Sequence, residues 1–255
     1  MAAQLQAITE TNMESPLYAE MAQVEGTHWW FRGRRKIIIS MLGRFASQKG
    51  SLLDVGMGTG LNAALFAKLG FAVDGLESAP EAITIAKEVA PNVRVIESSF
   101  PSSVVPANHY AVVTMLDVLE HLQNDTAALH EVARVLAPNG IVLITVPAFS
   151  FLWSKHDELA HHYRRYRRYE LSARLREAGL EPQFVSYYNF FLFPAIALVR
   201  LATKALGIRK EGSDFSATPA LLNGVLSALF GAERFLLRLI PLPFGVSVVA
   251  VAKKV

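Results

Sequence analysis

The sequence predicts an α/β protein with a doubly wound, seven-stranded and mainly parallel sheet, and a helical insertion between the sixth and seventh strands. Three observations support this class. Short apolar runs alternate with helical patterns from residue 51 onward, the first run ends in a glycine-rich turn, and a long apolar segment precedes the last run. Such alternation is typical of a parallel sheet covered by helices on both faces. A chain of 255 residues is long enough to bury a sizeable core.

The predicted strands are short apolar runs, each bounded by turn or cap residues. They span residues 51–56, 71–77, 92–98, 110–116, 140–147, 182–189 and 245–254. Helical patterns occupy residues 61–70, 79–90, 126–138 and 170–179, and the third and fourth end at Pro138 and Gly179. Ligands of such sheets bind outside the carboxyl ends of the strands, where we therefore expect the functional site.

The composition excludes several kinds of site. There is no cysteine, which excludes disulfides, thiolate metal sites and cysteine nucleophiles. The net charge of +3 is too small to argue for nucleic acid, and the one dense basic patch, at residues 161–171, is a small footprint. The first 21 residues lack the basic and apolar regions of a secretory signal, so we expect a cytoplasmic protein, with peripheral contact to the inner membrane face as an option.

The glycine turn "LLDVGMGTG", residues 52–60, is the strongest local signal. Glycine lets the chain reverse tightly and lets a ligand approach backbone N–H groups. Gly56, Gly58 and Gly60 give G-x-G-x-G, whereas dinucleotide folds prefer G-x-G-x-x-G. The acid Glu77 ends the second strand, and a carboxylate there can accept both ribose hydroxyls. The pattern predicts a nucleoside cofactor; the alternatives are a structural turn and an acid at a helix N-terminus.

Together with "MLDVLEHL" at residues 115–122, these features resemble the class I S-adenosylmethionine-dependent methyltransferases. The resemblance covers residues 28–189 and the last strand, and it implies a Rossmann-like fold whose last strand is antiparallel. It also implies S-adenosylmethionine as the cofactor. The sulfonium already makes the methyl group reactive, so such an enzyme mainly has to align the acceptor.

The resemblance assigns roles to residues that match the family's motifs. Four of them surround the methionine part of the cofactor, namely Asp54, Gly56, Gly58 and Gly60. Glu77 holds the ribose, Leu116 and Asp117 lie beside the cofactor, and Glu120 and His121 form the floor of the substrate cleft. Two positions depart from the family pattern. Ser98 and Ser99 follow the third strand instead of Gly-Asp, so that Ser99 would accept a hydrogen bond from the adenine and Phe100 would stack on it, and Ala111 replaces an acid of the fourth strand.

The segment "HWWFRGRR", residues 28–35, resembles the family's N-terminal lid. In that resemblance Trp30 covers the cofactor and Arg34 pairs with its carboxylate. The alternative is an aromatic staple before a helix whose arginines form a solvated face. We assign residues 1–50 to this N-terminal segment and residues 51–189 with 245–255 to the cofactor-binding domain.

The segment after the fifth strand carries candidate catalytic groups. Asp157 and His161, four residues apart, would share a helix face and form a carboxylate-oriented imidazole that can act as a general base. His156 and His121 are the other candidate bases. We expect no metal ion among His156, Asp157, His161 and His162, because no metal-binding spacing is present. The run "RRYRRY" suits a phosphate-bearing substrate or anionic lipid, or is a solvated helix face.

The insertion at residues 190–244 is this chain's own addition, because the sixth and seventh strands of the family's plain form are joined as a hairpin. It contains two apolar helical patterns, and neither has the eighteen uninterrupted apolar residues of a membrane span. We expect it to lie in the membrane interface, to cover a lipid-like acceptor or to form a homodimer contact. The alternative is a helical layer on the protein's own sheet.

These observations favour a methyltransferase that acts on an oxygen or nitrogen atom of a small-molecule or lipid-linked acceptor. Two other functions stay open at this point. A nicotinamide-dependent oxidoreductase fits the sheet but not the glycine spacing. A non-catalytic adaptor of the same fold, at a membrane or partner surface, is supported only by the departures at Ser99 and Ala111.

Overall fold

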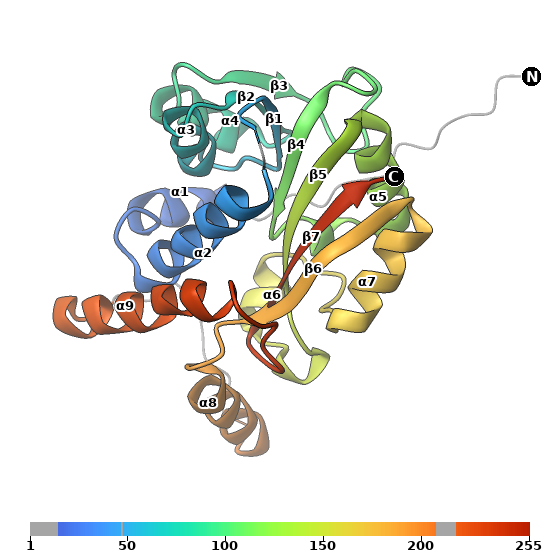
Figure 1. Ribbon diagram of the computed structural model, residues 1–255. Helices are drawn as coiled ribbons and strands as arrows, with labels where there is room; N and C mark the ends of the chain where they lie inside the picture. Colours follow the sequence, from blue (N-terminus) through green and yellow to red (C-terminus); the bar gives the residue numbers. More distant parts are fainter. Residues whose placement is uncertain (1–14, 47, 208–217) are drawn as a thin grey trace, which may run out of the picture.

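The computed structural model describes residues 15–46, 48–207 and 218–255 (Figure 1). The first part of the predicted N-terminal segment 1–50 and the middle of the predicted insertion 190–244 lie outside the described residues.

The predicted seven-stranded sheet is confirmed. Its strands are β1 Ser51–Val55, β2 Ala72–Glu77, β3 Arg94–Glu97, β4 Tyr110–Leu116, β5 Leu136–Pro147, β6 Leu180–Tyr188 and β7 Ser247–Lys254. They are ordered β3-β2-β1-β4-β5-β7-β6. The first five are parallel, and β7 runs antiparallel to both β5 and β6, as the resemblance implies. The order reverses between β1 and β4, which opens a crevice at the carboxyl edge.

Two helices cover one face of the sheet, α5 Asp125–Val135 and α7 Arg168–Glu177, whose buried leucines and valines join one core cluster. The other face is covered by α2 Trp29–Phe45, α3 Leu61–Lys68 and α4 Pro80–Val89, which share the second cluster. The buried strands read as continuous apolar runs because both faces of the sheet are covered.

The predicted end of the helix at Pro138 is wrong. Helix α5 ends at Val135, and β5 begins at Leu136 and contains Pro138. Leu136 is fully buried and pairs with Tyr110 of β4, so the start of the strand is fixed by packing. Up to the next pair, Val112 with Ile141, β4 advances two residues and β5 advances five, and Asn139 takes a left-handed backbone with φ of 65°. Such a bulge accommodates a proline that a regular ladder excludes.

The N-terminal segment forms α1 Ser15–Val24 and α2. His28 caps α2 by accepting from the Trp30 N–H, so the aromatic run begins the helix. Tyr18 of α1 packs against Ala79 and Ala82 at the start of α4. These contacts place α1 beside the carboxyl ends of β1 and β2.

The described part of the insertion forms α8 Phe193–Ala205 and α9 Ala220–Leu236. Figure 1 shows α9 lying along α2, while α8 projects away from the sheet. Phe230 of α9 is fully buried, stacks on Tyr188 with ring centroids 5.9 Å apart, and fits where Gly33 of α2 has no side chain. No helix among the described residues has the length and hydropathy of a bilayer-spanning segment.

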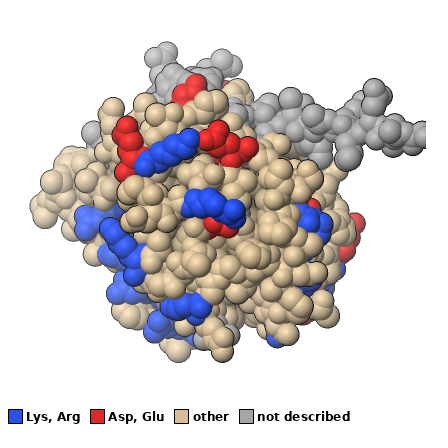
Figure 2. Space-filling model, turned by 90° about the horizontal axis from the view of Figure 1, so that it is seen from above, with Lys and Arg blue, Asp and Glu red and all other residues tan. Residues whose placement is uncertain are grey.

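Charged side chains are scattered over much of the surface. On the face drawn in Figure 2, lysines and arginines gather mainly along one edge, and most of the remaining surface is uncharged. This distribution agrees with the small net charge of the sequence.

Candidate active site

A large cavity lies at the carboxyl edge of the sheet. Its volume is about 1300 Å³, and it extends from the glycine turn after β1 to the inward side of α8. Many residues predicted for the site line it: Trp30, Arg34, Gly56, Gly58, Glu77, Phe100, Leu116, Asp117, His121 and His156. The structure therefore brings the predicted cofactor residues and two of the predicted bases to one space.

The glycine turn has the backbone that the sequence pattern requires. Gly56, Gly58 and Gly60 have φ of 63°, 55° and 84°, the left-handed region that glycine adopts without strain. The N–H groups of Gly56 and Met57 donate to the Leu76 carbonyl, and the Gly58 N–H donates to Glu77 Oε2 at 2.8 Å. These bonds join the ends of β1 and β2 into one rim of the cavity.

Glu77 accepts hydrogen bonds at the N-terminus of α4 and also lines the cavity. Its Oε1 accepts the N–H groups of Ser78 and Ala79 just before α4, as an acid at a helix N-terminus does. The same carboxylate bonds Gly58 and lines the cavity with 6% of its surface exposed. It is held in place by three backbone donors at the wall of the site.

Asp54 lies behind the cavity and is not part of its lining. It is buried at the end of β1 and accepts a hydrogen bond from Thr114 Oγ1 at 2.6 Å. Burial raises the pKa of Asp54 to about 7, even though the Thr114 hydrogen bond and the nearby Arg34 lower it; the charge of Glu77 raises it further. The carboxyl is therefore partly protonated at neutral pH.

We expect the free energy of unfolding of Asp54→Asn, measured without cofactor, to exceed that of the wild type by an amount that grows as the pH rises from 4 to 7. In this window the unfolded carboxyl, with its ordinary pKa of 3.8, has lost the proton that the folded carboxyl keeps, so its contribution to stability falls. Asparagine does not titrate, and the gain reaches up to about 4 kcal/mol and stays level above pH 7. Urea unfolding of both proteins at several pH values measures it. A pH-independent difference would contradict the assignment.

Arg34 is buried, with 5% of its surface exposed, so a solvated face is wrong for this arginine, although Arg32 is exposed. Its Nη2 lies 2.6 Å from Asp117 Oδ2, and its guanidinium lies 5.0 Å from the centre of the Trp30 ring. Its Nε has no hydrogen-bond partner among the described residues. The guanidinium thus faces the cavity with an unused donor, between the lid helix and the end of β4.

The predicted pairing of Asp157 with His161 is wrong. Helix α6 ends at Leu159, and His161 is exposed with a left-handed φ of 54°, so the two residues do not share a helix face. His162 takes that place, with its Nδ1 2.9 Å from Asp157 Oδ1. Arg165 makes two further bonds to the same carboxylate, each of 2.8 Å. Burial opposes ionisation, but the bonds from His162 and Arg165 hold the pKa of Asp157 well below its usual range.

The first half of the run "RRYRRY" is neither a free phosphate site nor a solvated helix face, whereas Arg167 and Tyr169 in the second half are exposed at the start of α7. Its first two arginines pair with acids: Arg164 lies 2.9 Å from Asp125, and Arg165 binds Asp157. Tyr166 is buried and donates to Asp125 at 2.8 Å. The first half of the run is therefore used to hold the segment against the protein.

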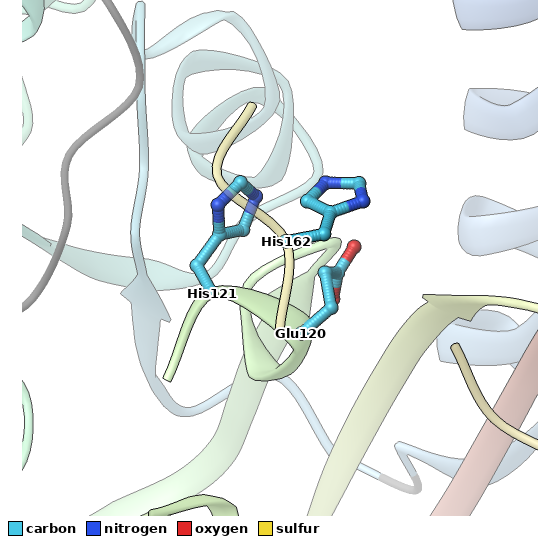
Figure 3. A group of neighbouring side chains, drawn as sticks. All are labelled: Glu120, His121 and His162. Carbon is cyan, nitrogen blue, oxygen red and sulfur yellow. The ribbon is translucent and has the colours of Figure 1, made fainter. Parts of the chain in front are cut away.

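Three side chains that line the cavity meet: Glu120, His121 and His162 (Figure 3). Glu120 and His121 come from the short helix η1 Leu119–His121, and the Tyr163 N–H donates to the Glu120 carbonyl, which holds the later segment beside it. Burial, followed by the neighbouring His162, lowers the pKa of His121 to about 3. His121 is therefore neutral at pH 7.

Some predicted residues do not reach the cavity. Ser99 is exposed and lies outside the lining, as does His161. Gly60 caps α3 and packs against Ala86, where a Cβ would lie 3.2 Å away. Ser99, where the sequence differs from the family pattern, is therefore not part of the cavity lining.

The sequence analysis missed other lining residues. Tyr18 and Met21 of α1 lie at the glycine end, and Val199, Arg200, Thr203 and Lys204 of α8 lie at the other end. The spacing of the α8 residues, i, i+1, i+4 and i+5, is one face of a helix and was a usable signal. Nothing in the sequence places α1 against the glycine turn, because that contact depends on tertiary packing.

A family model described as a methyltransferase domain matches residues 28–184, which is more than half of the chain. The chain belongs to the class I S-adenosylmethionine-dependent methyltransferases. Among curated relatives, the ubiquinone biosynthesis O-methyltransferase of Xanthomonas axonopodis pv. citri (strain 306) is 31% identical over 153 residues, which is 53% of this chain and 64% of the relative. That of Klebsiella pneumoniae (strain 342) is 31% identical over 150 residues, covering 50% and 60%. The chain thus spans less than two thirds of these relatives.

Solved structures share the fold of this methyltransferase. The putative methyltransferase from a complex with the Haloferax volcanii Trm112 activator has a TM-score of 0.61 at 17% identity, covering 93% of this chain and 94% of that one. A Haemonchus contortus phosphoethanolamine N-methyltransferase 2 in complex with S-adenosyl-L-methionine has a TM-score of 0.56 at 18% identity, covering 85% and 51%. The family match supports a methyltransferase and not a nicotinamide-dependent oxidoreductase.

The cofactor of this methyltransferase is S-adenosylmethionine, and the residues at the glycine end of the cavity fit it. The glycines leave the backbone at the rim of the cavity without side chains. A Cβ on Gly58 would lie 3.3 Å from Met21 Cε and narrow the space between them. The buried ring of Phe100 lines the cavity, and Arg34 Nε is a donor without a hydrogen-bond partner among the described residues. An apolar ring suits an adenine, and a carboxylate suits the hydroxyls of a ribose. A cation and a glycine backbone suit the amino-acid end of the cofactor.

Proposed function

We propose that this methyltransferase transfers a methyl group to a hydroxyl oxygen of a hydrophobic acceptor that it takes from a membrane surface. The observation that carries the proposal is the shape of the cavity. One end is the glycine turn, and the other is the inward side of α8, whose outward side is apolar and exposed. A lipid-like acceptor can therefore reach the methyl group without crossing water.

In this proposal the glycine end holds the cofactor. The turn from Gly56 to Gly60, backed by Asp54, surrounds the methionine part, and Glu77 accepts the ribose hydroxyls. Phe100 would contact the adenine, Leu116 and Asp117 would lie beside the cofactor, and Trp30 and Arg34 would cover it from α2. When bound, the cofactor supplies an electrophilic methyl carbon. The chain's own contribution is to hold the acceptor oxygen in line and to exclude water.

The acceptor hydroxyl would lie against Glu120, His121 and His162, which face the same cavity. A hydroxyl must lose its proton to become a good nucleophile, and these are the groups that can take or stabilise that proton. An oxygen acceptor is further supported by the name of the two curated relatives, both O-methyltransferases. Asp157 acts here as a positioning residue because it holds the His162 ring.

The membrane part of the proposal rests on the surface of the insertion. Large apolar side chains there are exposed: Leu198, Val199, Leu201, Leu206, Leu221, Leu222, Val225, Leu229, Phe235, Leu239 and Ile240. The described part of the insertion carries Arg200, Lys204, Arg234 and Arg238, and its one acid, Glu233, is buried. An apolar surface edged by cations suits the interface of a bilayer with anionic lipids.

Labelled S-adenosylmethionine tests the acceptor. The purified protein is incubated with membranes from its own cells, and the products are divided between organic and aqueous phases. We expect a methyl-labelled product in the organic phase that survives as an ether on mild alkaline hydrolysis, as an O-methylated hydroxyl would. Label confined to small water-soluble products, or carried on nitrogen, would contradict the proposal.

We expect the double substitution Leu198→Glu and Leu221→Glu to weaken binding to phosphatidylglycerol vesicles by at least about tenfold, since each glutamate removes apolar contact and adds repulsion. Both leucines are exposed, at 70% and 84%, so folding should be unaffected. Val104→Glu, on a loop residue that is 65% exposed, is the matched control. Co-sedimentation measures binding. Equal binding of all three proteins, or a self-association that the leucine variants abolish instead, would contradict membrane docking.

A further inference from the structure

We propose that Glu120, His121 and His162, which line the cavity, bind one divalent transition-metal ion. The site is distinct from the cofactor end and uses residues 41 positions apart in the sequence. No sequence spacing points to it, because the residues are brought together only by the contact between η1 and the segment after α6.

The geometry supplies the donors. One ligand atom of each residue lies within 4.8 Å of the others, and Figure 3 shows the Glu120 carboxylate and the two rings directed to the same side. Bonds to a metal of about 2.0–2.2 Å place neighbouring ligands about 3.0–3.5 Å apart, so the side chains must close by about 1–2 Å. Both histidines line the cavity, although the His162 side chain is only 7% exposed.

Glu120 is the second, independent observation. It is fully buried, and neither carboxylate oxygen has a hydrogen-bond partner among the described residues. A buried polar group without partners costs free energy, and a bound cation is one way to satisfy both oxygens.

Both imidazoles are oriented as metal ligands usually are. His162 Nδ1 is bonded to Asp157, which leaves Nε2 for an ion, and Asp157 is itself fixed by Arg165 and Ser154. The backbone of Ala160 lies beside the His121 ring. A carboxylate or carbonyl behind each ligating histidine fixes its tautomer and raises its basicity. The cluster thus has the outer partners of a metal site.

The donor set indicates the class of metal. Two imidazole nitrogens and one carboxylate suit zinc, iron(II), manganese(II) or cobalt(II) better than magnesium or calcium, which prefer all-oxygen ligands. Three protein ligands leave at least one position open to the cavity. A role for that position in binding the acceptor oxygen and lowering the pKa of its hydroxyl rests on the proposed function. The binding of the ion itself does not.

Cobalt(II) is the probe, because its visible absorption reports nitrogen and oxygen ligands directly. The full chain, treated with chelator and free of cofactor, is titrated with Co²⁺. We expect one equivalent to bind with visible absorption bands, Zn²⁺ to displace it, and the midpoint of thermal unfolding to rise with Co²⁺. Glu120→Gln keeps the shape of the side chain and should weaken binding at least about tenfold, since the anionic ligand is lost.

His162→Gln should have the same effect, and His161→Gln, which removes the neighbouring exposed imidazole, should have none. Unchanged binding of S-adenosylhomocysteine shows that each variant is folded. Absence of cobalt binding to the wild type, or equal binding by Glu120→Gln and His162→Gln, would overturn the proposal. Transfer to a lipid-phase acceptor is assayed separately, so its failure leaves the metal result intact.

Discussion

Gly58→Arg is expected to abolish binding of S-adenosylhomocysteine. The Gly58 backbone is left-handed, its N–H bonds Glu77, and the space beside it belongs to the cavity. An arginine side chain would fill that space and strain the turn, with a loss of affinity of about 100-fold or more, or about 2.7 kcal/mol. Isothermal titration calorimetry of both proteins measures the change.

Gly43→Arg is the matched control. Gly43 is exposed on α2, has no left-handed φ, and a Cβ there would meet no atom within 4 Å. It adds the same side chain and charge outside the cavity and should leave the affinity at the wild-type value. Wild-type affinity in Gly58→Arg would show that the cofactor lies elsewhere.

Phe230→Ala is expected to destabilise the protein by about 3–5 kcal/mol, because it empties a fully buried aromatic site in the second core cluster. The ring fills the space over Gly33 and contacts Trp29 and Tyr188. Urea unfolding followed by circular dichroism measures the free energy.

Leu229→Ala is the comparison. Leu229 is the preceding residue of α9 and is 39% exposed, so its loss should cost much less than that of Phe230. Equal costs would mean that α9 does not pack on α2 as described. If the costs differ as expected, α9 is a structural layer of the domain, and docking to lipid uses only its outward side.

The strands and the cofactor end were predictable because their signals are local. Each strand is a buried apolar run, and the glycine turn and Glu77 lie where a parallel sheet places its ligands. The start of β5 at Leu136 was not predictable, because a proline inside a bulge has the same sequence signal as the end of a helix. The last strand was identified from its apolar run, although its neighbours β5 and β6 lie far from it in sequence.

The acceptor end was only partly predictable. A spacing of four residues favoured His161 as the partner of Asp157, but α6 is too short to carry that spacing, and the chain turns so that His162 faces the carboxylate. Glu120 was assigned to the cleft from the family motif, yet its lack of hydrogen-bond partners could be seen only in the structure. Contacts between η1 and the segment after α6 depend on long-range packing, which periodicity does not report.

The position of β7 has a consequence for the order in which the protein folds. β6 is the edge strand, and its partner β7 follows it in the chain only after residues 189–246. During synthesis, β6 and the helix packed beside it must wait for β7 before they join the sheet. Closing a connection of this length slows folding because its entropy is lost before the strand contacts form. Early docking of α9 on α2 would shorten that search, so we expect the insertion to set the rate at which the sheet is completed.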